Sequence, residues 1–275
     1  MFIDKFNLMI LFFIKKNFFD GWDNAFWIIA SNILVMAVAA ACYFGASGIL
    51  DLAFLPQWLA VGISVSLLIL GIFGVVSLVM SINECCAKIA NFSTVSVKEI
   101  FANYKAGIKD SILLSLLLGA VCLVAVVGIP FYYNMGNSVG SLFSALLFWV
   151  VLVVVLALQW FLPLRSQMQG NFKKTLKKCF IILFDNTGFS IFMFIYNLVL
   201  TVLSCIVFFF PGFAGISLAL NNALRLRLYK YDWLEQHPDI SPKDARKQIP
   251  WGELIAEDAE IVGQRTLKSM FFPWK

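Results

Sequence analysis

Five side-chain amides interrupt the apolar stretches of this sequence: Asn32, Gln159, Asn197, Asn221 and Asn222. In an apolar setting an amide can tie two helices together through hydrogen bonds. It can also line a polar pocket that binds a small solute. The adjacent pair Asn221-Asn222 is the first candidate for such a pocket, because it interrupts the least apolar stretch. Both interpretations are open at this level.

No Asp, Glu, Lys, Arg or His lies in the middle of these apolar stretches. Proton relays and most ion-coupled pathways place ionisable groups there, so the sequence counts against a proton-coupled pump. A hydrolase would need a nucleophile with a base, or a set of metal ligands. We therefore predict a protein that is not an enzyme, with no catalytic residue, no cofactor and no metal site.

The histidine and the cysteines likewise give no indication of a metal site or of disulfide bonds. The single histidine, His237, excludes the usual multi-histidine metal sites. Each cysteine lies in an apolar run or at its Lys-flanked end, so we expect small packing residues and no disulfide framework. The predicted free thiols are Cys42, Cys85, Cys86, Cys122, Cys179 and Cys205.

Long apolar helices must position these groups. Hydrophobic residues make up 61% of the chain and charged residues 13%, and the mean hydropathy is +0.86. In soluble domains about a quarter of the residues are charged. A helix of about 20 apolar residues is long enough to cross a membrane. The sequence predicts an all-α, polytopic membrane protein with six transmembrane helices in three hairpins. The predicted spans are 25–45, 59–80, 111–130, 141–164, 188–210 and 212–230, within a membrane domain over 1–230.

Lys and Arg predict the orientation. Cytoplasmic loops carry an excess of both residues. With six spans and an internal N-terminus, all 21 Lys and Arg fall on the cytoplasmic side, whereas five spans would place the basic tail outside. We therefore expect both termini in the cytoplasm, with residues 231–275 as a cytoplasmic tail.

Amphipathic segments precede three of the spans, and we expect them at the cytoplasmic interface. The first lies within Met1–Lys16. The second begins with a capping-box pattern from Ser96 to Glu99, which predicts a helix start. In the third, one stripe is apolar and the opposite face holds four lysines. The stripe is Phe172, Leu176, Cys179, Phe180 and Leu183, and the lysines are Lys173, Lys174, Lys177 and Lys178.

The tail has its own amphipathic pattern. After Pro250 we predict a helix from Trp251 to about Met270, with Asp258 and Arg265 close to its apolar face. Acidic residues oppose an anionic membrane surface, so we expect this helix to dock on a Lys-rich protein surface, of this chain or of a partner. The candidate docking residues are Trp251, Leu254, Ile255, Ile261, Val262, Phe271, Phe272 and Trp274.

The chain resembles the YesL-like family of bacterial integral membrane proteins over roughly residues 24–229. The resemblance rests on Asn24 and Asn32 at the start of span one, on the connector TVSVKEIFANYKAGIKDSILLSLLL and on the segment KKTLKKCFIILFDN. It implies a six-helix protein of the bacterial inner membrane, associated with carbohydrate uptake systems, and it brings no catalytic residues. The tail is an addition to the family pattern.

The expected function is that of a non-enzymatic accessory or scaffold subunit. It would act through its cytoplasmic surface on a cytoplasmic or membrane protein partner, with the lipid bilayer around its spans. The alternative is a small-solute permease or permease component, with a pocket of amides and aromatic residues. The excess of Lys and Arg belongs to cytoplasmic loops, so we expect no nucleic-acid partner. The sequence predicts no particular oligomeric state.

Overall fold

In the computed structural model, the described residues are 2–52, 54–207, 210–238, 248–263 and 265, with the side chains of residues 2–7 left aside. Within these ranges the chain forms helices joined by short turns, without a strand. The helices are α1 (Phe2–Asp23), α2 (Ala25–Leu50), α3 (Gln57–Ala90), α4 (Val97–Leu123), the π-helix η1 (Val124–Gly128), α5 (Ile129–Tyr133), α6 (Ser138–Leu158), α7 (Phe161–Met168), α8 (Phe172–Asp185), α9 (Thr187–Ile206), α10 (Gly212–Gln236), α12 (Trp251–Leu254) and α13 (Ala256–Val262).

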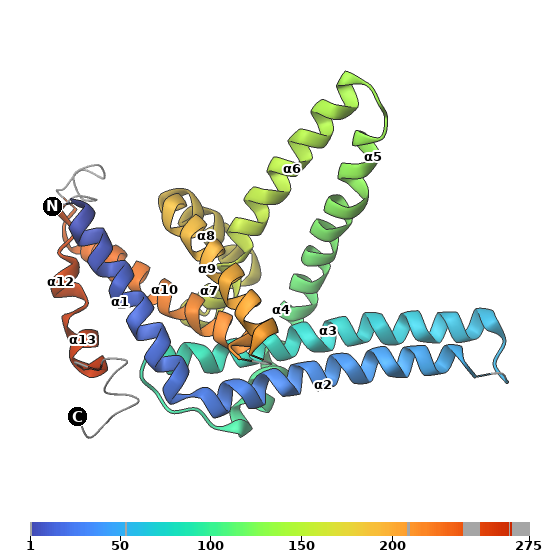
Figure 1. Ribbon diagram of the computed structural model, residues 1–275, viewed down its shortest axis with the longest axis horizontal. Helices are drawn as coiled ribbons and strands as arrows, with labels where there is room; N and C mark the ends of the chain where they lie inside the picture. Colours follow the sequence, from blue (N-terminus) through green and yellow to red (C-terminus); the bar gives the residue numbers. More distant parts are fainter. Residues whose placement is uncertain (1, 53, 208–209, 239–247, 264, 266–275) are drawn as a thin grey trace.

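Two helical hairpins project in different directions from a common base (Figure 1). One hairpin is α2 with α3, and the other is the continuous α4–η1–α5 rod with α6. The base contains α1, α7, α8 and the tail helices, and α10 runs through it from the foot of the hairpins. From here on, the term base means the part of the molecule formed by α1, α7, α8, α10, α12 and α13.

Five helical segments of the described chain are long and apolar enough to cross a membrane, as judged by length and composition. These five segments are Ala25–Leu50, Gln57–Ala90, Val97–Tyr133, Ser138–Met168 and Thr187–Ile206. They overlap the first five predicted spans, so the prediction of an all-α chain with at least five helices long and apolar enough to cross a membrane is confirmed. They are the elements that a multi-pass membrane protein requires.

The predicted sixth span, 212–230, corresponds to most of α10, which is not one of these five segments. The start of α10 lies against α2 and α3, because Asn32 Nδ2 donates to Pro211 O at 2.8 Å and Cys86 Sγ contacts Ala214 O at 3.3 Å. Asn32 lies near the start of α2, and Cys86 near the end of α3. A sixth crossing through α10 therefore remains a prediction.

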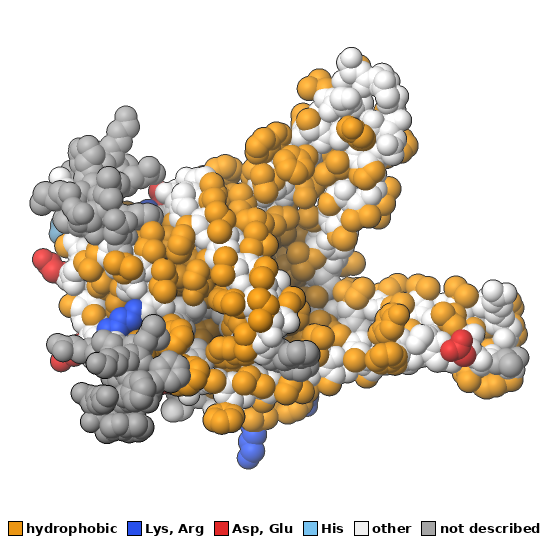
Figure 2. Space-filling model, viewed as in Figure 1, with side chains coloured by type: hydrophobic (Ala, Val, Ile, Leu, Met, Phe, Trp, Pro, Cys, Tyr) orange, Lys and Arg blue, Asp and Glu red, His pale blue; other side chains and the backbone are white. Residues whose placement is uncertain are grey.

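The surface of the hairpins is apolar. Figure 2 shows hydrophobic side chains over both of them, with Lys and Arg side chains near the base. Leu70, Leu142 and Trp149 are each more than 60% exposed. Leaving one large apolar side chain in water forgoes about 1.5–3 kcal/mol relative to burying it. A surface with many such residues is suited to a lipid environment.

Small residues let α2 and α3 approach closely. A Cβ added at Gly71 would lie 2.8 Å from Cys42 Cβ, closer than non-bonded carbons pack. Further along the pair, Ser64 Oγ donates to Ala46 O at 2.8 Å. This hairpin is therefore held by close backbone packing and interhelical hydrogen bonds, as expected where lipid replaces water.

The base has a core rich in aromatic residues. Trp160, Phe161 and Phe13 are completely buried. The rings of Phe13 and Phe189 pack edge-on, with their centres 6.4 Å apart. Cys179 of α8 belongs to the same core, and burial raises the pKa of its thiol to about 12. All six cysteines are free in the structure.

Helices are present at the three amphipathic segments predicted before the spans, but one predicted detail is wrong. The segment α8 buries Cys179 and Leu183 and exposes Lys173, Lys174 and Lys177, as its stripe predicted. Helix α4 begins at Val97 as predicted, but the Ser96 side chain makes no capping hydrogen bond. The expected capping box is therefore wrong, and the Glu99 carboxylate instead pairs with Lys88 at 3.1 Å.

Candidate functional site

Helix α10 carries polar side chains into the middle of the base. Asn221 and Asn222 are completely buried, and Arg227 and Lys230 are each 4% exposed. Buried polar groups are costly unless they have hydrogen-bond partners. The partners of Asn221, Asn222 and Arg225 come from α1, α3, α7 and the tail. We call the resulting set the polar junction: Lys16, Asn17, Asp20, Asn83, Ser166, Gln167, Asn221, Asn222, Arg225 and Asp258.

Asn221 joins α10 to α3 and α7. Its Nδ2 donates to Asn83 Oδ1 at 2.8 Å, and its Oδ1 accepts from Gln167 Nε2 at 2.9 Å and from Ser166 Oγ at 3.3 Å. Asn83 Nδ2 also donates to Ser166 Oγ at 3.1 Å. Both ends of the Asn221 amide therefore have partners on other helices, which favours the role of a structural tie.

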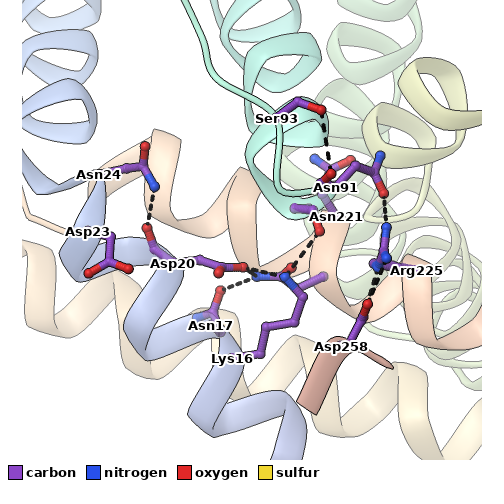
Figure 3. Close-up of polar contacts among 12 residues, drawn as sticks. Lys16, Asn17, Asp20, Asp23, Asn24, Asn91, Ser93, Asn221, Arg225 and Asp258 are labelled. Atoms are coloured by element: carbon purple, nitrogen blue, oxygen red, sulfur yellow. Dashed lines mark hydrogen bonds and ion pairs between the residues drawn. The ribbon is translucent and has the colours of Figure 1, made fainter. Parts of the chain in front are cut away.

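Asn222 joins α10 to α1 through the buried ion pair of Lys16 and Asp20. Figure 3 shows the two residues of this pair on α1. Its Nδ2 donates to Asp20 Oδ2 at 3.0 Å, and the same oxygen accepts from Lys16 Nζ at 2.7 Å. Lys16 Nζ also donates to Ala90 O at 3.1 Å and lies 3.8 Å from the centre of the Phe92 ring. Ala90 is the last residue of α3, where the carbonyls favour a cation.

The Lys16–Asp20 pair is almost completely withdrawn from water. Lys16 is 1% exposed and Asp20 is 8% exposed. Burial lowers the pKa of Lys16 and raises the pKa of Asp20, and the attraction between the two charges opposes both shifts. A pair with this many partners positions α1 against α3 and α10.

The tail docks on its own chain through a second buried ion pair. The Asp258 side chain is 0% exposed and receives two hydrogen bonds from Arg225, from Nε at 2.9 Å and from Nη2 at 2.7 Å. Tyr229 Oη donates to Asp258 Oδ1 at 3.0 Å, and Arg225 Nη1 also donates to Asn91. Such a bidentate pair fixes both position and orientation.

The predicted apolar face of the tail is buried in part, and the predicted extent of the helix is wrong. Trp251, Ile255 and Val262 are buried, whereas Ile261 is 52% exposed and Leu254 is half-buried. Instead of one helix to about Met270, two short helices meet at Ile255, and α13 ends at Val262. Gly263 ends it, with a φ of 70° that favours glycine. The predicted docking residues Phe271, Phe272 and Trp274 lie outside the described residues.

A further polar cluster attaches the α8–α9 connection to α10. Lys230 Nζ lies 2.5 Å from Asp185 Oδ2 and 2.9 Å from Asn186 Oδ1. Arg227 Nη1 also contacts Asn186 Oδ1, and its guanidinium lies 4.0 Å from the Phe189 ring centre. This cluster places the start of α9 relative to α10.

The five predicted amides do not form one pocket. Asn32 holds the start of α10, where Ala214 N donates to its Oδ1 at 2.9 Å. Gln159 Nε2 donates to Ser190 O at 3.0 Å, at the contact between α6 and α9. Asn197 is half-buried, and its Oδ1 has no hydrogen-bond partner among the described residues. Four of the five amides therefore make contacts between helices, two of them in the polar junction and two, Asn32 and Gln159, outside it.

The charged members of the junction were missed from the sequence. In the sequence Lys16 resembles a charge that flanks an apolar segment, although its spacing of four from Asp20 is that of a helical ion pair. The position of Asp258 beside the apolar face of the tail is the sequence signal for its burial. Within the described ranges, His, Cys, Asp and Glu side chains do not form a group of three that could hold a metal ion.

Comparisons with family models, with curated proteins and with solved structures find no match for this chain, so the resemblance to the YesL-like family remains an expectation.

Proposed function

We propose that this chain is a YesL-like protein of the bacterial cytoplasmic membrane, and that it is a non-enzymatic accessory or scaffold subunit that acts through its base. The observation that carries the proposal is the way the polar junction ties α1, α3, α7, α10 and the tail into one unit. A fixed polar unit at the foot of apolar hairpins offers a surface on which another protein can assemble. In a permease, the amides would be expected to line one shared pocket.

The proposed orientation places the base and both termini in the cytoplasm. Lys88, Lys98 and Arg165 lie at the base ends of the hairpins, whereas the opposite turns contain Asp51 and Asn137 and no Lys or Arg. This distribution follows the excess of positive charge on the cytoplasmic side. In this topology α9 and α10 are the fifth and sixth crossings, so the number of crossings is even.

Cysteine labelling tests this topology. In a variant without native cysteines, we expect Ser138→Cys and Val207→Cys to react with an impermeant thiol reagent in intact cells. Glu235→Cys should react only after the cells are permeabilised. All three positions are exposed in the structure. Protection of Val207→Cys, with Ser138→Cys still labelled, would show that neither α9 nor α10 crosses the membrane. External labelling of Glu235→Cys together with Val207→Cys would show that α9 crosses without α10 and would place the tail outside.

The docked tail suggests the surface that a partner uses. Glu253, Glu257 and Glu260 are exposed on α12 and α13, while the opposite face packs on the base. We expect the full chain, purified in mild detergent, to retain a stoichiometric protein partner. The variant Glu257→Lys/Glu260→Lys should lose most of that partner, because each reversal turns an attraction to a basic surface into a repulsion.

A matched control changes two exposed acids elsewhere on the base. Asp232→Lys/Glu235→Lys alters the net charge by the same amount on α10 and should keep the partner. Both variants should unfold at the temperature of the parent protein. Absence of any stoichiometric partner from the parent protein, or equal loss in the two variants, would contradict the proposal.

A further inference from the structure

A cleft of about 900 Å³ opens between α3, α4 and the connection from α7 to α8. Its lining contains four cationic side chains, which are Lys109, Arg165, Lys173 and Lys174. It contains two acidic ones, Glu84 and Asp110. None of these residues belongs to the polar junction, so the cleft is a separate feature of the base.

Both acids of the cleft are engaged by the same arginine. Arg165 Nε lies 2.6 Å from Asp110 Oδ2, and its Nη1 lies 3.8 Å from Glu84 Oε1. The three lysines of the cleft form no ion pair with the described residues. The cleft therefore presents an excess of positive charge to whatever enters it, which favours an anion.

The start of α8 adds to this preference. Its first residues, Phe172 and Lys173, line the cleft, and the side chain of its N-terminal flanking residue, Asn171, makes no capping hydrogen bond. The first N–H groups of a helix have no partner within the helix, and the helix dipole favours negative charge there. These groups supplement the lysines.

The apolar part of the lining distinguishes a lipid from a soluble anion. Met80, Leu113 and Phe172 form part of the lining. Leu113 is 38% exposed, and Leu116, one turn further along α4, is 58% exposed. An apolar track therefore leads from the charged part of the cleft along the segment that is apolar enough to cross a membrane. An amphiphile can satisfy both parts, whereas a soluble phosphate compound would use only the charged part.

We propose that this cleft binds the phosphate headgroup of an anionic phospholipid, with its acyl chains lying along α4 beside Leu113 and Leu116. Basic pockets between membrane helices on the cytoplasmic side are suited to such headgroups. The proposal requires a membrane setting and is independent of the accessory role, because neither the tail nor a partner protein contributes to the cleft.

Lipid titration of the delipidated, full-length protein tests the proposal. Native mass spectrometry would measure the first bound lipid with phosphatidylglycerol and with phosphatidylcholine. We expect a clear preference for phosphatidylglycerol. The variant Lys173→Glu/Lys174→Glu should bind it about 30-fold more weakly, on the order of the attraction of two basic residues to an anionic surface.

The matched control is Lys98→Glu/Lys105→Glu, which makes the same charge change at exposed positions of α4 outside the cleft. It should keep the parent affinity within about twofold, because neither side chain lines the cleft and exposed charges are screened by salt. If the double reversal in the cleft fails to fold, the neutral variant Lys109→Gln/Lys173→Gln should still weaken binding selectively.

Three outcomes would overturn the proposal. The first is equal binding of the two lipids by the parent protein. The second is an equal loss of affinity in the cleft variant and in the control. In the third, glycerol phosphate alone protects the cleft lysines from acylation as well as phosphatidylglycerol does, which would identify the site as one for a soluble phosphate compound.

Discussion

Replacing Lys16 by methionine lowers the free energy of unfolding by about 3–5 kcal/mol, the usual loss when one partner of a buried ion pair is removed. The reason is that Asp20 then remains buried beside Asn222 without its cation. Asp20→Asn should cause a loss of similar size, because the buried Lys16 would lose its opposite charge and keep neutral close partners such as Ala90 O and the Phe92 ring. Unfolding in mixed micelles with increasing denaturing detergent measures both.

The double variant separates this pair from an ordinary packing defect. Lys16→Met/Asp20→Asn removes both charges and keeps an acceptor for Asn222, so its loss should be well below the sum of the two single losses. Lys98→Met removes an exposed lysine and should change the free energy by no more than about 0.5 kcal/mol. Additive losses in the double variant would show that the two charges do not stabilise one another.

The two single variants should also respond to pH in opposite directions. In Asp20→Asn, burial keeps the pKa of Lys16 in the folded chain below its ordinary value of 10.5, so between these two pKa values the unfolded chain holds a proton that the folded chain has released. Stability then rises with pH in that range. In Lys16→Met, the buried Asp20 has a pKa raised above 3.8, and stability falls as pH rises from that value. If the free energy of unfolding changed with pH in the same direction in both variants, the result would contradict a buried ion pair.

Replacing Asp258 by alanine should release the tail from the base. Its carboxylate is completely buried and accepts from Arg225 and Tyr229, so its loss leaves a cation without its main partner. We expect the amides of Trp251–Val262 to exchange with solvent about 100-fold faster, which corresponds to about 3 kcal/mol for a broken buried pair. Hydrogen exchange read by mass spectrometry measures this, with the amides of α3 as an internal reference.

A second ion pair of the same tail is the matched control. Arg265 Nη1 lies 2.6 Å from Asp23 Oδ2, but both side chains are 50% exposed. Exposed pairs contribute about 0–1 kcal/mol, so Arg265→Ala should speed exchange by less than about fivefold. If Arg265→Ala released the tail as much as Asp258→Ala, burial would not be what makes the Arg225–Asp258 contact strong.

Features set by local pattern were predictable from the sequence. Length and apolar composition place five long helices, and the stripe of Cys179 and Leu183 predicts the buried face of α8. These signals depend on residues within a few turns of each other. The end of the tail helix was missed, although Gly263 stood in the sequence as a residue that favours a helix stop.

The polar junction depends on contacts that no local pattern contains. Lys16 meets a carbonyl 74 positions away, and the Asp20 carboxylate meets Asn222 at a separation of 202. A lysine beside an apolar block resembles an interfacial charge, and only the placement of α3 and α10 withdraws it from water. For the same reason Asn221 and Asn222 could be named as polar and buried, while their partners Asn83 and Asp20 could not.

The polar junction cannot be complete until the segment that contains Asp258 has been synthesised. Helix α1 and both hairpins are synthesised before Asn222 and Arg225 exist, so Lys16 and Asp20 spend that time without α10 above them. The hairpin of α2 and α3 contains its own close contacts and can pair as soon as it enters the bilayer. Synthesis thus imposes an order in which the hairpins can form first and the base closes last.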